Sequence, residues 1–243
     1  MRDPRGGQRR QAIEKLLNTI LIPVNRAGWP FIAGFAVAAL LLWTFSGFLG
    51  FLGLIATLWC VWFFRDPERM TPVRRGLVVS AADGVVCAVT QAIPPADLGL
   101  PDQPLTRISV FLDIFDVHVN RVPIDGIVRA VRYRPGTFIN ASLDKASEDN
   151  ERNAVRIETP EGPSIVVVQI AGLIARRIKS WISEGDAVLA GARFGLIRFG
   201  SRVDVYLPDG VAPLVAPGQR CIAGETVIAD LRAQEPARAA ERR

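Results

Sequence analysis

Histidine and cysteine, the residues most used to bind metals, are scarce in this chain of 243 residues. His118 is the only histidine, and the three cysteines form no Cys-x-x-Cys pair. Cys60 lies in a long apolar run, while Cys87 and Cys221 are far apart in the sequence. This pattern disfavours both a metal site and a disulfide framework. It is typical of a protein kept in a reducing, cytoplasmic compartment.

Charged residues are absent from Trp29 to Phe64, a run of 36 positions. As one helix this run would be roughly 54 Å long, well beyond a hydrocarbon core of about 30 Å. Two short helices joined by a turn near Ser46-Gly47 fit better, and four tryptophans in the run suit anchoring at a membrane interface. We therefore expect residues 29–64 to form a membrane hairpin, either spanning or re-entrant.

Basic residues flank both ends of the apolar run, which by the positive-inside rule places both ends on the cytoplasmic face of the cell membrane. They are Lys15 and Arg26 before it and Arg65, Arg69, Arg74 and Arg75 after it. A secretory signal peptide fits less well, because the run is too long, starts too far into the chain and is not followed by a small-residue cleavage site.

The segment before the hairpin, residues 1–28, is basic, and apolar residues recur at helical spacing between positions 10 and 22. We expect an amphipathic helix there, lying on the membrane or packing on the protein itself. The net charge of +5 favours anionic lipid headgroups as partners. Nucleic acid is not an expected partner, because no basic run is interleaved with aromatic residues.

Short runs of valine and isoleucine, broken by glycine, proline and aspartate, fill residues 65–232. This pattern predicts a mainly β domain with many short strands. The stretch Gly172–Ile182 has apolar residues at helical intervals and predicts a helix, with a strand as the alternative for its first half. Residues 233–243 have little apolar surface to bury and are expected to be a disordered tail.

Two pairs of segments repeat within this β domain. Ala82–Val89 echoes Ile124–Val131, each with Asp-Gly ahead of a strand, and Gly185–Gly191 echoes Gly218–Gly224. Both motifs resemble those of biotinyl/lipoyl-type barrel-sandwich domains, although no Met-Lys-Met attachment sequence is present. We therefore predict a duplicated hybrid β-barrel that shares this shape without carrying a swinging cofactor.

The Gly200-Ser201 pair is a candidate site of self-cleavage, although most such pairs are turns. A serine hydroxyl can attack the preceding glycine carbonyl, because glycine has no side chain in the way. His118 is the natural base, since histidine alone has an unperturbed pKa near neutrality. Asp83, in an Asp-Gly turn, would then fix the imidazole tautomer, as the third member of a serine-protease-like triad does.

The residues alone leave simpler interpretations open. His118 can be a histidine satisfied within a strand, and Asp83 can belong to an ordinary turn, as Asp125-Gly126 does. Asp116, two positions before the histidine, competes with Asp83 for the orienting role.

Four longer stretches resemble the short, prokaryotic type of phosphatidylserine decarboxylase. They are FFRDPER (Phe63 to Arg69), FDVHVNRVPIDG (Phe115 to Gly126), LDKASEDNERN (Leu143 to Asn153) and RFGSRVDVYLP (Arg198 to Pro208). The likeness runs from about Trp29 to Asp230. The chain departs from the family pattern at two places, both beside the residues expected to do the chemistry. The family's Ser-Pro-Ala-Asp-Gly reads Ser80-Ala81-Ala82-Asp83-Gly84 here, and the Ser-Pro often found before Phe-Asp-Val-His reads Asp113-Ile114.

The resemblance implies a proenzyme that cleaves itself between Gly200 and Ser201, with Ser201, His118 and Asp83 as catalytic residues. Ser201 would become a pyruvoyl group, the electron sink for decarboxylation in place of pyridoxal phosphate. Fragments 1–200 and 201–243 would remain together as a heterodimer. The substrate would be phosphatidylserine held in the membrane, and the products would be phosphatidylethanolamine and CO₂.

Two arginines flank the predicted cleavage site, and either of them can be a phosphate ligand or a solvated strand residue. They are Arg198 and Arg202. The polar stretch Leu143–Asn153 by itself is typical of a solvated loop, and the resemblance implies a structural or processing role for it with no assigned chemistry. Two other functions stay open from the sequence: a membrane-tethered lipoyl-like adaptor without catalysis, and a pyruvoyl decarboxylase of another amino acid derivative.

Overall fold

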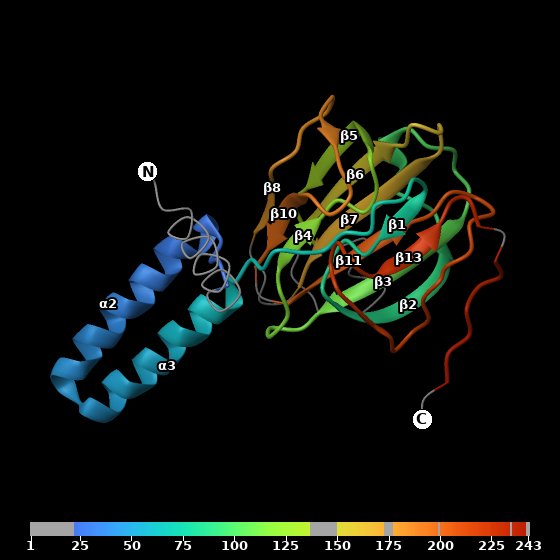
Figure 1. Ribbon diagram of the computed structural model, residues 1–243. Coiled ribbons are helices and arrows are strands. Elements are labelled where there is room, and N and C mark those ends of the chain that lie inside the picture. Colours follow the sequence, from blue (N-terminus) through green and yellow to red (C-terminus); the bar gives the residue numbers. More distant parts are fainter. Residues whose placement is uncertain (1–21, 137–149, 173–176, 199, 234, 242–243) are drawn as a thin grey trace, which may run out of the picture. The chain divides into compact units, whose positions relative to one another are not determined.

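The computed structural model describes residues 22–136, 150–172, 177–198, 200–233 and 235–241. The chain divides at Glu68 and Arg69 into two compact units, which are considered separately. The first unit contains the helices α2 and α3, and the second contains the strands (Figure 1). The amphipathic helix predicted for residues 10–22 lies outside the described residues except at its last position.

The first unit is a helical hairpin, as predicted. Helices α2 (Trp29–Phe45) and α3 (Gly47–Phe63) follow a short 3₁₀ turn, η1 (Arg26–Gly28), and extended Ser46 separates them. Gly53 lets the helices approach closely, because a Cβ atom there would come within 2.7 Å of the Ala39 Cα. By length and composition, Arg26–Phe45 suffices to cross a membrane, and the apolar helix α3 is shorter.

The second unit is mainly β, also as predicted. Its largest sheet has eight antiparallel strands in the order β12-β2-β3-β11-β7-β6-β5-β9 and curls strongly (Figure 1). These strands are β2 (Gly84–Ala92), β3 (Leu105–Leu112), β5 (Gly126–Arg134), β6 (Arg152–Glu158), β7 (Ser164–Ala171), β9 (Ala187–Val188), β11 (Ser201–Tyr206) and β12 (Arg220–Cys221).

Two smaller sheets and one 3₁₀ turn, η2 (Ala96–Leu98), complete the unit. Strands β4 (Val119–Arg121), β10 (Arg193–Ile197) and β8 (Ile178–Ser180) form one sheet, while β1 (Leu77–Val79) pairs with β13 (Val227–Asp230). The helix predicted over Gly172–Ile182 is wrong for Ile178–Ser180, which pairs with β10. Only Ile178 of this strand is buried, so helical spacing of apolar residues did not reflect a helical face.

The duplication predicted from sequence is visible in equivalent hydrogen bonds. In one copy the N–H of Gly218 donates to the Val86 carbonyl (2.8 Å). In the other, the N–H of Gly185 donates to the Val128 carbonyl (2.8 Å). The copies also cross-connect reciprocally: Val79 N–H donates to Pro123, and Arg121 N–H donates to Ala81. The two Asp-Gly turns therefore occupy equivalent places in a pseudo-symmetric pair.

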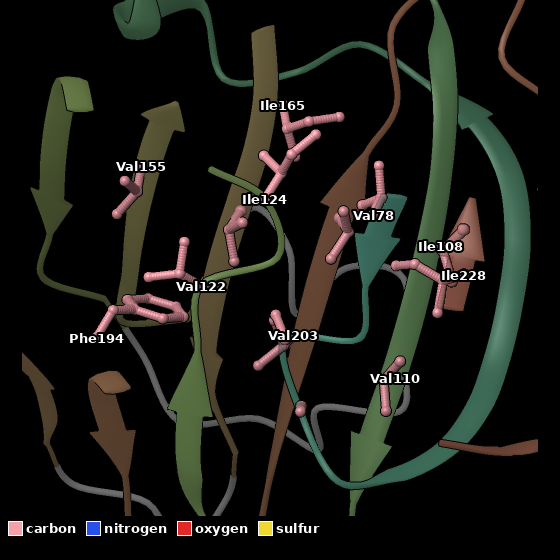
Figure 2. Packing of buried hydrophobic residues seen from close by; sticks show 14 of the residues in the cluster. Val78, Ile108, Val110, Val122, Ile124, Val155, Ile165, Phe194, Val203 and Ile228 are labelled. Carbon is pink, nitrogen blue, oxygen red and sulfur yellow. The ribbon is translucent and has the colours of Figure 1, made fainter. Parts of the chain in front are cut away.

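The main core fills the inside of the curled sheet and is built from branched aliphatic side chains (Figure 2). Val203 and Val205 of β11 belong to this core, together with Ile108 and Val110 of β3. Because side chains alternate along a strand, Ser201 faces the same side of the sheet as Val203. The first residue of β11 is thus held in the protein interior.

Candidate active site

Ser201 begins a strand in the middle of the largest sheet. It pairs with Leu112 of β3 on one side and with Ala171 of β7 on the other. Its side chain is fully buried, and its Oγ atom has no hydrogen-bond partner among the described residues. A buried hydroxyl without a partner is costly, so this placement points to a chemical use rather than to stability.

Gly200, the preceding residue, is hydrogen-bonded at both ends of its backbone. Its N–H donates to Nε2 of His118 at 3.2 Å, and its carbonyl oxygen accepts from the Gly172 N–H at 3.1 Å. Its φ of +70° lies in the left-handed region that favours glycine. This conformation directs the N–H toward the imidazole while the carbonyl stays beside β7. Phe199 is outside the described residues.

His118 is fully buried and precedes β4. Its Nδ1 atom lies 3.0 Å from the Asp116 carbonyl oxygen, which can only accept a hydrogen bond. Nδ1 therefore carries the proton, and Nε2 has the lone pair that receives the Gly200 N–H. The structure thus brings the predicted base to the predicted cleavage site, with its unprotonated nitrogen facing that site.

Asp83 lies in the turn before β2, and its carboxylate holds two groups. One oxygen pairs with Arg69 at 2.6 Å, and the other accepts the Ala223 N–H at 2.8 Å. Burial raises the pKa of Asp83, and the nearby Arg69 guanidinium and Ala223 N–H lower it part of the way back. Its orienting role toward His118 stays a prediction.

Asp116 enters the site through its backbone, not through its carboxylate. The carbonyl faces His118 Nδ1, while the buried carboxylate accepts from the Asp113 N–H at 2.9 Å and pairs with Arg220. The Asp116 carboxylate is near enough to Asp83 to contribute to its raised pKa. The sequence could not show this tautomer-setting carbonyl, because every residue carries one.

Arg202 does not fit the phosphate role considered from the sequence. The residue is 1% exposed, and its guanidinium pairs with Asp204 through Nε at 2.8 Å and Nη2 at 3.0 Å. The Nε of Arg107 lies 4.0 Å from the same carboxylate. A positive charge that is paired inside the protein is not available to a lipid headgroup, so the geometry favours a structural role.

Arg198 lies in a different environment, half-buried before the cleavage site. Burial lowers its pKa and the positive charge of Arg177 lowers it further, while Glu151 acts in the opposite direction. Two guanidinium groups near one another repel, and an anion between them would relieve that repulsion. The phosphate role of Arg198 therefore stays a prediction, and Arg177 is a neighbour that sequence reasoning missed.

The described end of the polar stretch Leu143–Asn153 is buried beside the cleavage site. Asn150 Nδ2 donates to the Ala171 carbonyl at 2.7 Å, and the Glu151 carbonyl accepts the Ala171 N–H at 2.9 Å. The Glu151 carboxylate accepts from Tyr133 and from the backbone of Ile178. Sequence reasoning gave this stretch no chemistry, yet it fixes the end of β7 that faces Gly200.

The described residues contain no group of three or more histidine, cysteine or acidic side chains that could hold a metal ion. What the site assembles is a buried serine, a glycine carbonyl held by a backbone N–H, and an imidazole in a defined tautomer. These are the parts that an intramolecular acyl transfer requires.

Comparison with known proteins gives a consistent result. The sequence profile of the phosphatidylserine decarboxylase family matches residues 56–229. The phosphatidylserine decarboxylase proenzyme of Paramagnetospirillum magneticum is 58% identical over 226 residues, which cover 93% of this chain and 94% of that protein.

Two further relatives carry the same name. The phosphatidylserine decarboxylase proenzyme of Ruegeria pomeroyi is 57% identical, covering 90% of this chain and all of that protein. The proenzyme of Cereibacter sphaeroides is 56% identical, covering 92% of this chain and 96% of that protein.

Proposed function

Because the chain belongs to the phosphatidylserine decarboxylase family, we propose that it is a self-processing lyase that converts phosphatidylserine to phosphatidylethanolamine and CO₂. The high identity over nearly the whole length of several such proenzymes supports this activity. The same similarity does not favour a tethered adaptor without catalysis. The observation that carries the proposal is that the backbone of Gly200, next to Ser201, is hydrogen-bonded to His118 Nε2 and to the Gly172 N–H.

Self-cleavage begins at Ser201. Its Oγ attacks the Gly200 carbonyl carbon, and its proton passes to Nε2 of His118, the nitrogen that the Asp116 carbonyl leaves unprotonated. Nε2 exchanges its hydrogen bond with the Gly200 N–H for this proton. Collapse of the tetrahedral centre breaks the bond between Gly200 and the Ser201 nitrogen. His118 returns the proton to that nitrogen, and an ester replaces the amide.

The second stage removes the ester. Loss of the Ser201 α-proton expels the Gly200 carboxylate and leaves a dehydroalanine, whose imine tautomer is hydrolysed by water to release ammonia and leave a pyruvoyl group at position 201. A pyruvoyl group supplies an electron sink for the pair left behind by departing CO₂. The interior position of Ser201 fits such a group, since it is buried beside an imidazole that can hold a proton.

The products of cleavage are expected to stay together as a heterodimer of residues 1–200 and 201–243. β11, which begins the small fragment, lies between β3 and β7 and pairs with each of them over six residues. Removing it would expose Val203, Val205 and their core partners to water. Burial of a central strand therefore supports a lasting association.

The apolar hairpin supports attachment to the cell membrane, with the β unit on the cytoplasmic face. Many of its large side chains are exposed, including Phe45 at 82% and Phe48 at 69%, as lipid-facing side chains would be. A membrane location suits the substrate, because the acyl chains of phosphatidylserine stay in the bilayer and only its headgroup must reach residue 201. Arg198 is the proposed ligand of the headgroup phosphate.

Intact-mass measurement of the purified protein tests this function. We expect two chains, one ending at Gly200 and one beginning with a pyruvoyl group in place of Ser201, and we expect release of CO₂ from phosphatidylserine. Ser201→Ala should remain a single chain without activity. An active enzyme that consists of one uncleaved chain would contradict the proposal.

A further inference from the structure

The carbonyl that self-cleavage must attack already receives a hydrogen bond. The Gly172 N–H donates to the Gly200 oxygen at 3.1 Å, one step beyond the pairing of Ser201 with Ala171. In a regular antiparallel ladder a hydrogen-bonded pair exchanges two such bonds. Here the Gly200 N–H donates to His118 Nε2 instead of to Gly172. The pair therefore keeps only the hydrogen bond from Gly172 to the Gly200 carbonyl oxygen, the atom that would become the oxyanion.

The donor peptide group is itself held from behind. The Gly172 N–H belongs to the Ala171-Gly172 peptide, and the carbonyl of this same peptide accepts from Asn150 Nδ2 at 2.7 Å. Asn150 is 1% exposed, and the Ala171 N–H is fixed separately by the Glu151 carbonyl. Hydrogen bonds in series polarise one another in a low-dielectric interior. The Asn150 amide therefore both orients the N–H and strengthens it as a donor.

We propose that the Ala171-Gly172 peptide supplies the oxyanion-stabilising N–H of self-cleavage, and that Asn150 is the residue that positions it. This inference rests on the proposed function. When Ser201 Oγ bonds to the Gly200 carbon, the carbonyl π pair moves onto oxygen, and the Gly172 N–H donates its hydrogen bond to the resulting oxyanion. The Ser201 proton goes to His118. The charge disappears again when the carbon–nitrogen bond breaks and His118 protonates the Ser201 amine.

An oxyanion donor acts through the difference between ground state and transition state. The Gly172 N–H meets a neutral oxygen in the precursor and an anionic one in the tetrahedral intermediate, and hydrogen bonds to charged acceptors are about twice as strong. Removing one such donor costs roughly 10²- to 10³-fold in rate in well-studied sites. If this hydrogen bond had only a structural role, its removal would lower stability without specifically slowing the acyl transfer.

The test compares side-chain variants of full-length precursor by following the small fragment over time after synthesis in a cell-free system with membranes. Asn150→Ala and Asn150→Asp remove the amide donor to Ala171, and we expect cleavage to slow at least 10-fold. The matched control is Asn153→Ala, another buried asparagine, whose Nδ2 donates to Gln169 at 3.0 Å. We expect this control to cleave within about threefold of the unaltered chain.

A backbone pair tests the donor directly. Gly172→Pro removes the N–H, whereas Gly172→Ala keeps it. We expect slowing of roughly 10²- to 10³-fold for proline, as for the loss of one oxyanion donor, and much less for alanine. Urea unfolding of each variant, made in a Ser201→Ala background that cannot cleave, reports stability separately. If the proline variant does not fold, the Asn150 variants decide the question.

Hydroxylamine shows which step is slowed, because it cleaves an ester but not an amide. We expect slowed Asn150 variants to yield no additional fragment with hydroxylamine, since their Gly200-Ser201 bond is still an amide. Cleavage of folded Asn150→Ala at the unaltered rate would overturn the inference, and so would accumulation of the hydroxylamine-sensitive ester. If the unaltered chain itself does not cleave after Gly200, the proposed function fails instead.

Discussion

The turns at Asp83 and Asp125 are copies of one another, yet only Asp83 is proposed to take part in catalysis. Each carboxylate accepts a backbone N–H from the loop of a Gly-x5-Gly segment, Ala223 in one copy and Ala190 in the other, both at 2.8 Å. Each precedes a nine-residue strand with a register shift in its first half. The shared geometry therefore belongs to the fold.

The difference lies in the residues at equivalent positions of the two halves of the duplication. The alignment that places Asp83 with Asp125 also places Gly76 with His118. One of these positions therefore carries a buried imidazole and the other has no side chain, and Arg69 pairs with the Asp83 carboxylate. Asp125 is exposed and lines a surface hollow with Gly76 and Leu189. The duplicated framework thus supplies two similar turns, and we propose a chemical role for Asp83 alone.

The largest effect is expected at the histidine that distinguishes the two copies. His118→Ala should block cleavage at Gly200, because no other histidine exists to take the Ser201 proton. The measurement is appearance of the small fragment over a day, with circular dichroism to verify folding. Cleavage at the normal rate would show that a different group, such as Asp83, acts as the base.

The paired aspartates allow the most direct comparison of the two turns. Asparagine keeps an oxygen for the Ala223 or Ala190 N–H, so each substitution removes charge and retains the turn. Asp83→Asn should slow cleavage strongly, by up to the order of 10⁴-fold seen when a triad loses this group. Asp125→Asn should change the rate little.

Time courses of fragment formation for these two variants, run side by side with thermal unfolding, check this expectation. Equal slowing at both positions would mean that the turns serve folding alone. It would also remove Asp83 from the proposed catalytic residues.

A smaller effect on pH dependence is expected from Arg69, which pairs with Asp83, whereas Asp125 has no ion pair among the residues that the structure describes. Arg69→Gln removes a charge that lowers the pKa of Asp83, so this already raised pKa should rise further. If ionised Asp83 is needed, cleavage at neutral pH should slow and recover as pH increases. The shift should be about one pH unit or more.

The matched control for this change is Arg74→Gln, which breaks an ion pair with Asp230 in the same unit. We expect its cleavage profile to keep the position of the unaltered chain when rates are measured across pH. A displaced profile in both variants would indicate a general effect of lost charge and would separate Arg69 from the chemistry.

The sequence alone determined the features that depend on local pattern and chemical uniqueness. An uncharged run with a Ser46-Gly47 break predicted the helical hairpin, because apolar length and turn residues act locally. The repeated Asp-Gly and Gly-x5-Gly segments predicted the duplication. A single histidine made His118 the natural base, and the likeness around Gly200-Ser201 indicated the cleavage site.

Only the tertiary structure decided how these parts meet. Arg198 and Arg202 look alike in sequence, but one is half-buried near a second arginine and the other pairs inside the sheet with Asp204. The strand at Ile178–Ser180 was missed because pairing with β10 overrides its helical spacing. The groups around the proposed cleavage site include the Asp116 carbonyl and the Gly172 N–H, which belong to the backbone. The sequence cannot identify them, because nearly every residue carries these backbone groups and their direction is set by the fold.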